Sequence, residues 1–157
     1  METHIRNYTA SDREACLHLF DCNTPLFFDP SEREGLVNWL NAKDEGRLAY
    51  GSNLAEPFYV LEQQGRVVGC AGFYIPEHEK QAIMVWGMVD NTLHKKGLGR
   101  QLLEYRIGIV KQHYPDCAVH LDTTQHSYGF FERLGFSVTK ITADYYGPGL
   151  SRYDMVL

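Results

Sequence analysis

The sequence predicts a single α/β domain, an α+β arrangement in which helices flank a mixed β-sheet. The chain has 157 residues, a length typical of one domain. Residues 82–89 form a nearly continuous apolar run, as in a strand covered on both faces. A helical stripe follows, made of Leu98, Leu102, Tyr105 and Ile109 and widened by Leu103, Ile107 and Val110. Because no repeat, low-complexity tract or linker interrupts the chain, we treat residues 1–157 as one domain.

The first part of the chain predicts a strand and two helices. Residues 4–8 are an opening strand, and Ser11 with Glu14 forms a capping box for a helix with apolar positions Ala15, Leu17, Leu19 and Phe20. A proline-bounded apolar loop, residues 24–30, comes next. Ser31 caps the second helix, which buries Leu36, Val37, Trp39 and Leu40.

The central part predicts three adjacent strands. Polar residues 41–56 return the chain to the sheet. Residues 58–62 and 67–75 make a hairpin through the turn at 64–65, and residues 81–89 extend it. Phe73 and Trp86 are expected in the core.

The last part alternates helix and strand. After the long helix come a strand at 118–123, a short helix that Gly135 ends in the left-handed conformation, and strands at 137–143 and 153–156. This order of elements predicts a mixed sheet flanked by helices.

Composition narrows the range of functions. Fifteen Lys and Arg against twenty Asp and Glu give a net charge of −5, so the overall field favours neither nucleic acid nor an anionic membrane. No apolar run approaches the ~20 residues of a membrane span. Zinc-site and C-x-x-C spacing are absent from the four cysteines, Cys16, Cys22, Cys70 and Cys117. Cys16 lies on a helix stripe and Cys70 in an apolar run, so buried, reduced thiols are expected. We therefore expect a cytoplasmic protein without a metal.

The turn after the strand at 81–89 has the features of a phosphate site. Its sequence, residues 94–99, is His-Lys-Lys-Gly-Leu-Gly. The first turn of a helix presents unpaired N–H groups and a positive dipole end, and Gly97 and Gly99 allow a ligand close to the backbone. A dinucleotide-binding fingerprint is excluded because Leu102 stands where it needs Gly or Ala. A P-loop is excluded because Arg100 and Gln101 follow Gly99.

Residues 94–99 resemble the Gln/Arg-x-x-Gly-x-Gly/Ala signature of the GCN5-related N-acetyltransferases, the GNAT family, with His94 in place of Gln or Arg. Residues 121–136 resemble a second GNAT pattern, Asn-x-x-Ala-x-x-Phe-Tyr-Glu-Lys-x-Gly-Phe. There Thr124 falls on the Asn, Ser127 on the Ala and Phe131 on the Tyr. The two motifs occur in the family's order, and the resemblance is specific from residue 81 to residue 136.

The resemblance implies a GNAT-like, mostly antiparallel sheet whose central strands splay apart after Val89 and Leu121 to admit acetyl-CoA. It assigns the backbones of Met88 and Val89 to the pantetheine arm, one N–H there polarising the thioester. It assigns a side-chain contact with the cofactor to Thr124, and Phe131 also falls in the cofactor site. The pyrophosphate falls to Lys95, Lys96, Gly97, Leu98, Gly99 and Arg100.

The implied activity is acetyl transfer to a primary amine of a small molecule or peptide, by direct attack in a ternary complex. Two alternatives stay open. One is a non-catalytic acyl-CoA-binding or sensing module, because Phe131 replaces a tyrosine that many GNAT enzymes use as an acid. The other is an interaction domain that has lost its cofactor site.

Acetyl transfer needs a group that takes a proton from the amine. Asp122 and His120 share one strand face with Thr124 and are candidates for the cleft. A loop-fixing role for Asp122 stays open, and Glu79 and Asp90 are rivals for the base. His126 is expected to be solvated.

For the general acid we expect Tyr128, three residues before Phe131 on the short helix. Tyr145 and Tyr146 are alternatives if the following Gly-Pro-Gly loop covers the acceptor. Phe27, Phe28 and Asp29 are expected at the acceptor pocket, unless the aromatic residues only seal the core. An exposed sheet edge makes a homodimer plausible.

Overall fold

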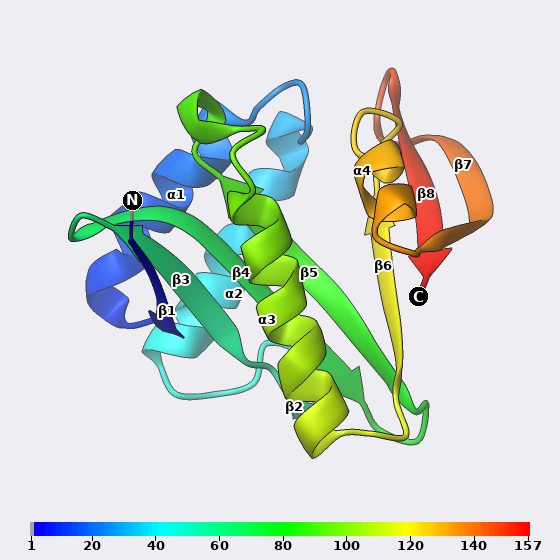
Figure 1. Cartoon of the computed structure of the whole chain (residues 1–157), viewed down its shortest axis with the longest axis horizontal. Coiled ribbons are helices and arrows are strands. Elements are labelled where there is room, and N and C mark those ends of the chain that lie inside the picture. The colour runs from blue at the N-terminus through cyan, green and yellow to red at the C-terminus, as the bar shows by residue number, and fades with distance from the viewer. Residues whose placement is uncertain (1) are drawn as a thin grey trace.

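A mixed eight-stranded sheet forms the centre of the protein (Figure 1). The computed structural model describes residues 2–157. The strands are β1 (Thr3–Asn7), β2 (Asn53–Ala55), β3 (Phe58–Gln63), β4 (Arg66–Pro76), β5 (Gln81–Val89), β6 (Ala118–Thr123), β7 (Ser137–Gly147) and β8 (Leu150–Val156). The helices are α1 (Arg13–Cys22), α2 (Arg33–Asp44), α3 (Leu98–His113) and α4 (Tyr128–Arg133), with short 3₁₀ turns η1 (Ala10–Asp12), η2 (Pro30–Glu32) and η3 (Asn91–Leu93).

The strand order is β1-β3-β4-β5-β6-β8-β7, and β2 pairs with β4 at the side of this path. Every neighbouring pair is antiparallel except β5 and β6, which are parallel. The mixed, mostly antiparallel sheet predicted from the sequence is confirmed. β1 and β7 form its two edges, and dimerisation through such an edge stays a prediction.

The two central strands β5 and β6 part after a short paired segment. Gln81, Ala82 and Ile83 pair with residues 118–120, and no register is formed beyond them. In Figure 1, β5 and β6 meet at the bottom of the view and diverge toward the β5–α3 turn. The splayed central strands that the resemblance implied are therefore present.

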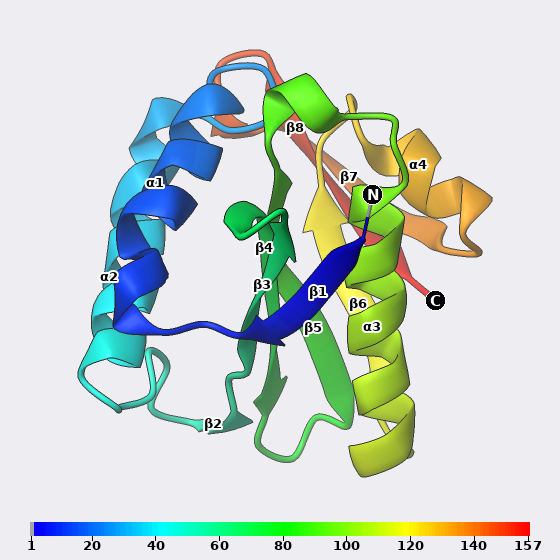
Figure 2. The same ribbon diagram turned by 60° about the vertical axis from the view of Figure 1, so that its left-hand side comes forward.

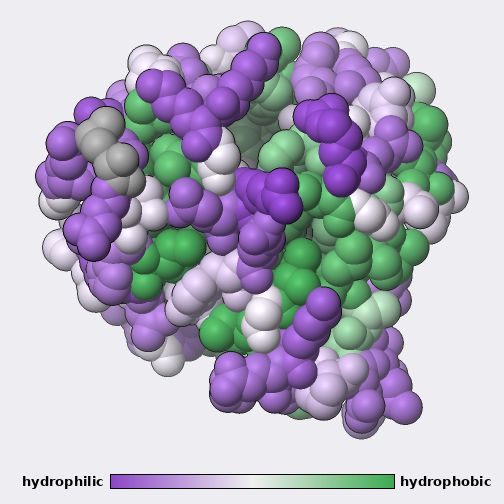
Figure 3. Space-filling view, in the orientation of Figure 1, coloured by the Kyte–Doolittle hydropathy of each residue, from purple (hydrophilic) through white to green (hydrophobic). Residues whose placement is uncertain are grey.

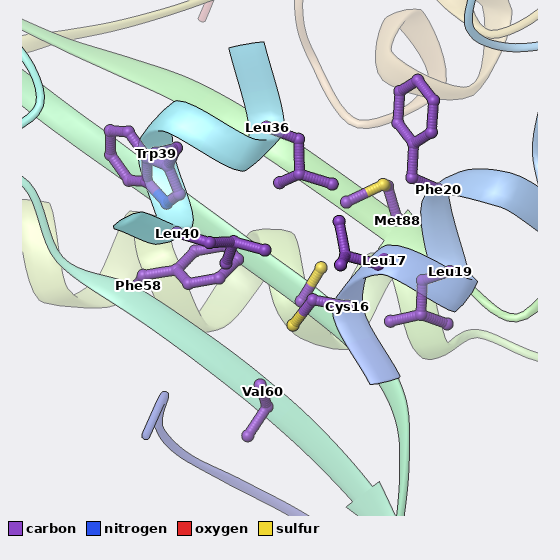
Figure 4. Close-up of a cluster of buried hydrophobic side chains, with 11 residues drawn as sticks. Cys16, Leu17, Leu19, Phe20, Leu36, Trp39, Leu40, Phe58, Val60 and Met88 are labelled. Carbon is purple, nitrogen blue, oxygen red and sulfur yellow. The ribbon is translucent and has the colours of Figure 1, made fainter. Parts of the chain in front are cut away.

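Helices cover the sheet on both faces. Figure 2 shows α1 and α2 together on one side and α3 on the other, with the strands between them. The core beneath α1 and α2 is drawn in Figure 4 and includes Cys16, Leu17, Leu19, Phe20, Leu36, Trp39, Leu40, Phe58, Val60, Cys70 and Met88. A second core contains Phe73, Leu103, Val110, Leu121, Phe136 and Met155. No helix within residues 2–157 is long and apolar enough to cross a membrane.

Both predicted helix caps are wrong, because a 3₁₀ turn precedes each helix. Asp12, not Glu14, closes the first capping box, where its Oδ2 accepts from the Thr9 N–H at 2.8 Å. Asp29, not Ser31, caps the second start, and its carboxylate accepts from the Ser31 N–H at 3.0 Å. Each cap therefore lies two residues earlier than expected.

One strand was not predicted, and two others, β7 and β8, are longer than predicted by three residues or more. The polar stretch 41–56 contains the end of α2 and the short strand β2. β7 continues to Gly147, so Tyr145 and Tyr146 belong to a strand and not to a loop. β8 begins at Leu150, three residues before its predicted start, because it pairs along this extension of β7.

A β-bulge interrupts the pairing of β4 with β5. Cys70 lies opposite Met88, but Gly72 lies opposite Val85, so β5 carries one extra residue. Trp86 takes up the distortion with a φ of 52°, and its carbonyl accepts a hydrogen bond from Cys70 Sγ at 3.6 Å. The bulge lies where β5 turns away from β6.

Two glycine-to-alanine substitutions are expected to have opposite effects on stability. Gly108 lies exposed in α3, and an added Cβ there would meet no atom within 4 Å, so Gly108→Ala should raise the free energy of unfolding by about 1 kcal/mol. At Gly72 a Cβ would lie 2.7 Å from Pro57 O and 3.2 Å from Trp39 Cζ2, so Gly72→Ala should lower it by roughly 1–3 kcal/mol. Urea denaturation measures both, and a shift of both variants in one direction would contradict the packing described here.

Candidate active site

A cleft of about 670 Å³ opens where β5 and β6 diverge. Figure 3 shows hydrophobic surface in the region between α3 and the unit formed by β6, α4 and β8. The cleft is lined by segments far apart in the sequence, among them Asn23, Phe27, Phe28, Glu32, Gly87, Val89, Gly97, Gly99, Arg106, Asp122, Thr124, Phe131 and Tyr146.

The β5–α3 turn presents free backbone N–H groups at one end of this cleft. Lys95 and Gly97 have positive φ values of 63° and 81°, and α3 begins directly after Gly97. The first bond into the helix is from Gln101 N to Gly97 O, 3.1 Å. In the described chain, none of the N–H groups of residues 95–100 donates a hydrogen bond. Such an array at a helix start is an anion site.

The predicted phosphate residues are brought together at this turn. Lys95, Lys96 and Arg100 are exposed, so their charges are available to a ligand. All six predicted residues except Lys96 line the cleft. Arg100 also pairs with Glu104 on the next turn of α3.

The register of β4 and β5 decides which backbone groups of β5 face the cleft. Asp90 N donates to Val68 O at 2.9 Å, and antiparallel alternation then makes Cys70 and Met88 the next hydrogen-bonded pair. Val89 lies between these pairs, so its N–H and C=O face away from β4. The N–H and C=O of Met88 therefore point to β4, whereas those of Val89 do not. Both residues line the cleft, and the cofactor contact expected at each stays a prediction.

Two side chains already meet the carbonyl of Val89. Asn23 Nδ2 donates to Val89 O at 2.9 Å and to Leu19 O at 2.7 Å. His94 Nε2 lies 3.1 Å from Val89 O. The histidine that departs from the GNAT signature thus bonds to the strand. Asn23 was missed because its partner is 66 residues away and nothing near Asn23 in the sequence indicates that contact.

Thr124 and Phe131 lie on the β6 side of the cleft. Thr124 is 5% exposed, and its Oγ1 accepts from the His126 N–H at 3.2 Å, which leaves the hydroxyl hydrogen free to donate. Phe131 lines the cleft and packs edge-on against Phe130, with ring centroids 5.0 Å apart.

Asp122 faces the cleft and is paired with a tyrosine from β7. The hydroxyl of Tyr146 donates to Asp122 Oδ2, and Arg152 Nη2 lies 3.8 Å from Asp122 Oδ1. Burial, reinforced by the carboxylate of Asp122, raises the pKa of Tyr146, so this hydroxyl keeps its proton. Tyr145 instead is 56% exposed and packs under Arg152.

The other candidate acids and bases lie elsewhere. Tyr128 stacks on Tyr153 with ring centroids 4.5 Å apart and does not line the cleft. Asp90 binds Arg66 at 2.7 Å and caps η3. Neither His120 nor Glu79 lines the cleft. His126 is exposed, as expected, and also borders the cleft. A catalytic role for Tyr128 stays a prediction, but the geometry favours Tyr146.

Glu32 is a cleft residue that the sequence analysis missed. Its Oε2 accepts from the Asp29 N–H at 2.8 Å. Burial raises the pKa of Glu32 to about 7, although the hydrogen bond from Asp29 lowers it. The negative charges of Asp122 and Asp29 raise it further. The spacing from Asp29 to Glu32 is itself a capping-box signal, but only the fold shows that Glu32 turns toward Asp122.

The predicted acceptor residues separate into two groups. Phe27 and Phe28 line the cleft; Phe27 lies edge-on to His94, and Phe28 stacks on Trp86. Asp29 does not line it, because its carboxylate binds Ser31. Within residues 2–157, no group of three or more His, Cys, Asp or Glu side chains is placed to hold a metal ion.

A sequence model of the acetyltransferase (GNAT) family matches residues 13–136. The chain belongs to this family. No curated protein matches this GNAT chain by sequence.

Several solved structures resemble the GNAT chain along nearly its whole length. The ribosomal-protein-S18-alanine N-acetyltransferase of Escherichia coli has a TM-score of 0.75 and 21% identity, over 99% of this chain and 93% of that one. The ribosomal-protein-alanine N-acetyltransferase of Brucella melitensis has a TM-score of 0.73 and 20% identity, over 98% of both chains. A Salmonella typhimurium structure with its cofactor acetyl-CoA has a TM-score of 0.73 and 19% identity, over 100% and 94%. At these identities the likeness shows the fold.

The raised pKa of Glu32 predicts a pH-dependent stability difference in this GNAT domain. Folding raises this pKa from 4.5 to about 7, so the stabilisation that Glu32 provides is present at low pH and is lost as the pH rises through 7. Glu32→Gln stays neutral. Its stability relative to the wild type should therefore grow between pH 4.5 and 7 and level off above 7. Urea denaturation across this range measures the difference.

The exposed neighbour Glu34 on α2 supplies the control. Glu34→Gln should show no such pH-dependent gain. A constant difference between Glu32→Gln and the wild type would mean that Glu32 is not held in a desolvated position.

Proposed function

We propose that this protein is a CoA-thioester-dependent N-acyltransferase, with acetyl-CoA as its simplest donor, that acts on a primary amine of a small molecule or peptide. The amine attacks the thioester directly while both substrates are bound. One observation carries the proposal: a single cleft contains both an anion site and a group of ionisable side chains. The free N–H groups of residues 95–100 lie at one end of the cleft, and Glu32, Asp122 and Tyr146 line it.

In this proposal the pyrophosphate of the donor binds the N–H groups of residues 95–100, and the charges of Lys95, Lys96 and Arg100 add long-range attraction. The pantetheine arm lies in the gap between β5 and β6. Val89 and Gly87, which alternate with Met88 along β5, are the strand residues that meet it. Thr124 donates its hydroxyl, and the ring of Phe131 covers the arm.

An N–H of the β5 bulge near Gly87 would stabilise negative charge that develops on the thioester oxygen. Gly87 is exposed to the cleft, whereas its neighbour Met88 is 4% exposed and packs in the core. One such donor contributes roughly 3 kcal/mol to a barrier of this kind. Because the backbone supplies this group, the role does not depend on a particular side chain.

Glu32 is our candidate for the general base. An alkyl amine with a pKa of about 10.4 is neutral in roughly one molecule in a thousand at pH 7, a cost of about 4.6 kcal/mol. A carboxylate with a pKa of about 7 is well matched to take the proton near neutral pH. The nearby charge of Asp122 attracts the cationic amine into the site.

Tyr146 is our candidate for a hydrogen bond to the departing sulfur, in place of Tyr128. Because its one O–H donates to Asp122 in this structure, the hydroxyl must turn from Asp122 to the sulfur in this step. It lines the cleft, whereas Tyr128 does not. A thiol has an ordinary pKa of about 8.5, so the thiolate can leave with a hydrogen bond and without complete proton transfer. In the balanced step the ammonium gives one proton to Glu32, and the neutral amine forms the C–N bond as the C–S bond breaks. The second amine proton passes to the departing thiolate, so CoA is released as the thiol.

One observation favours a second candidate, a non-catalytic acyl-CoA-binding module. Phe131 stands where the family pattern has a tyrosine, and a phenyl ring donates no proton. Turnover with a panel of primary amines and peptide N-termini, followed as released thiol, separates the two. Tight acetyl-CoA binding without thiol release on any acceptor would favour the binding module.

Gly99→Glu should abolish CoA binding. It places a carboxylate beside the phosphates and fills the space that they need, so we expect a loss of at least about 100-fold in affinity by calorimetry. Gly99→Ala is the matched control, because its Cβ would lie at an ordinary 3.7 Å from Phe130. Wild-type affinity in Gly99→Glu would remove the turn from the site.

The rate should depend on the ionisation of Glu32. Since a general base acts in its deprotonated form, kcat/KM should rise with pH through about 7. Glu32→Gln should flatten this limb and lower kcat by roughly 10²–10⁴-fold at unchanged affinity for acetyl-CoA. Tyr146→Phe should lower kcat, and Tyr128→Phe should not. A limb that persists in Glu32→Gln would assign the base to another group.

A further inference from the structure

Arg106 is a buried cation on the wall of the cleft. It lies on α3, is 4% exposed and belongs to the cleft lining. Among residues 2–157 it takes part in no ion pair. The sequence analysis did not point to Arg106, because the buried stripe predicted on α3 was apolar and did not include it.

Two of its three nitrogens are fixed by backbone carbonyls. Nε donates to Leu102 O at 3.1 Å, and Nη1 donates to Gly72 O at 2.9 Å. Gly72 lies where the bulge shifts the register between β4 and β5. Nη2 donates no hydrogen bond within the described chain, and it faces Gly87: a Cβ on Gly87 would lie 3.3 Å from it.

The guanidinium is charged at neutral pH. Burial lowers the pKa of Arg106 to about 10, still well above 7. A buried charge is costly unless an opposite charge and hydrogen bonds compensate it. Two buried carboxylates of this protein follow the rule: Asp12 binds Arg6 and Asp90 binds Arg66. Arg106 departs from it.

The hydrogen bonds to the two carbonyls account for Nε and Nη1. Nη2 is not a fully buried atom but reaches the cleft, and no carboxylate compensates the charge. The cleft beside Arg106 is also lined by apolar side chains, Met84, Leu102 and Leu121. In such surroundings a charge-assisted hydrogen bond to an anion is strong. The geometry therefore calls for an anionic group from a ligand at this point.

We propose that Arg106 binds a carboxylate at the far end of the transferred acyl group, so that the preferred donor is the CoA thioester of a short dicarboxylic acid. This inference rests on the proposed function, which brings the thioester to Gly87. Glu32 and Phe28 belong to the segment between α1 and α2, whereas Arg106 belongs to α3. Figure 2 shows α1 and α2 on one face of the sheet and α3 on the other. The amine thus approaches from one side of the sheet, and the acyl chain extends to the other.

The transfer itself needs no further reactant. The C–N bond forms and the C–S bond breaks as before, CoA leaves as the thiol, and the distal carboxylate remains bound to Arg106 unchanged. The product is an amide that carries a free carboxylate.

The test compares charged and neutral donors of equal chain length on the whole protein. Succinyl-CoA is matched with butyryl-CoA, and malonyl-CoA with propionyl-CoA, with acetyl-CoA and free CoA alongside. Calorimetry gives the affinities, and thiol release gives kcat/KM with an amine. We expect at least one of the two charged donors to exceed its neutral match in both by about tenfold or more.

Arg106→Met keeps the length of the side chain but removes its charge. It should bring the charged donor down to its neutral match and leave the affinities for butyryl-CoA and free CoA unchanged. Arg106→Lys should restore part of the preference. The control Arg47→Gln, at an exposed ion pair with Glu45 away from the cleft, should retain it in full.

The outcomes separate the inference from the function on which it rests. Equal use of charged and neutral donors by the wild type overturns the role of Arg106, while turnover of acetyl-CoA would leave the proposed function standing. If Arg106→Met slows all donors equally, Arg106 acts on the reacting carbonyl and the inference is wrong. If neither free CoA nor acetyl-CoA binds, both proposals fall. Should Arg106→Met not fold, as its melting curve would show, the wild-type comparison alone decides.

Discussion

The separation of β5 from β6 after three paired residues is the constraint on which the rest of the structure depends. Two parallel strands that part leave backbone N–H and C=O groups that must find other partners. The protein supplies some of these itself, as when Asn23 and His94 meet the carbonyl of Val89. The N–H groups of residues 95–100, in the turn after β5 and the start of α3, are left for a ligand, so the anion site lies at the end of the break in the sheet.

The bulge in β5 links this break to the chemistry of the cleft. By adding one residue opposite β4, it shifts the register beside Gly72, and Arg106 binds the carbonyl of that glycine. It also brings Gly87 against the guanidinium, where an added Cβ would lie 3.3 Å from Nη2 and press on it. The strand distortion, the small residue and the buried cation therefore form one unit, and none of the three is explained by packing alone.

The sequence predicted those features that depend on neighbouring residues. The bounds of β5 were correct because an apolar run between polar turns is a local signal, and the phosphate turn followed from two glycines before an amphipathic helix. The caps at Ser11 and Ser31 were wrong because a 3₁₀ turn precedes each helix, so that Thr9 and Asp29, two residues earlier, are the cap positions. Tyr146 and Arg106 depend on segments 24 or more residues away, and for these residues, as for Glu32, no local pattern fixes which side chain turns into the cleft.

Three groups at the cleft lower the stability of the protein when no ligand is bound. The buried carboxyl of Glu32 resists ionisation, Arg106 has no counter-charge, and a helix start has no acceptor for its N–H groups. The acceptor and the donor would compensate all three: the cationic amine pairs with Glu32, the acyl carboxylate with Arg106, and the diphosphate with the N–H groups. A simple alternative, an acidic residue beside Arg106, would compensate the buried charge and block the site. The gathering of these costs at one cleft is more easily explained by binding than by folding.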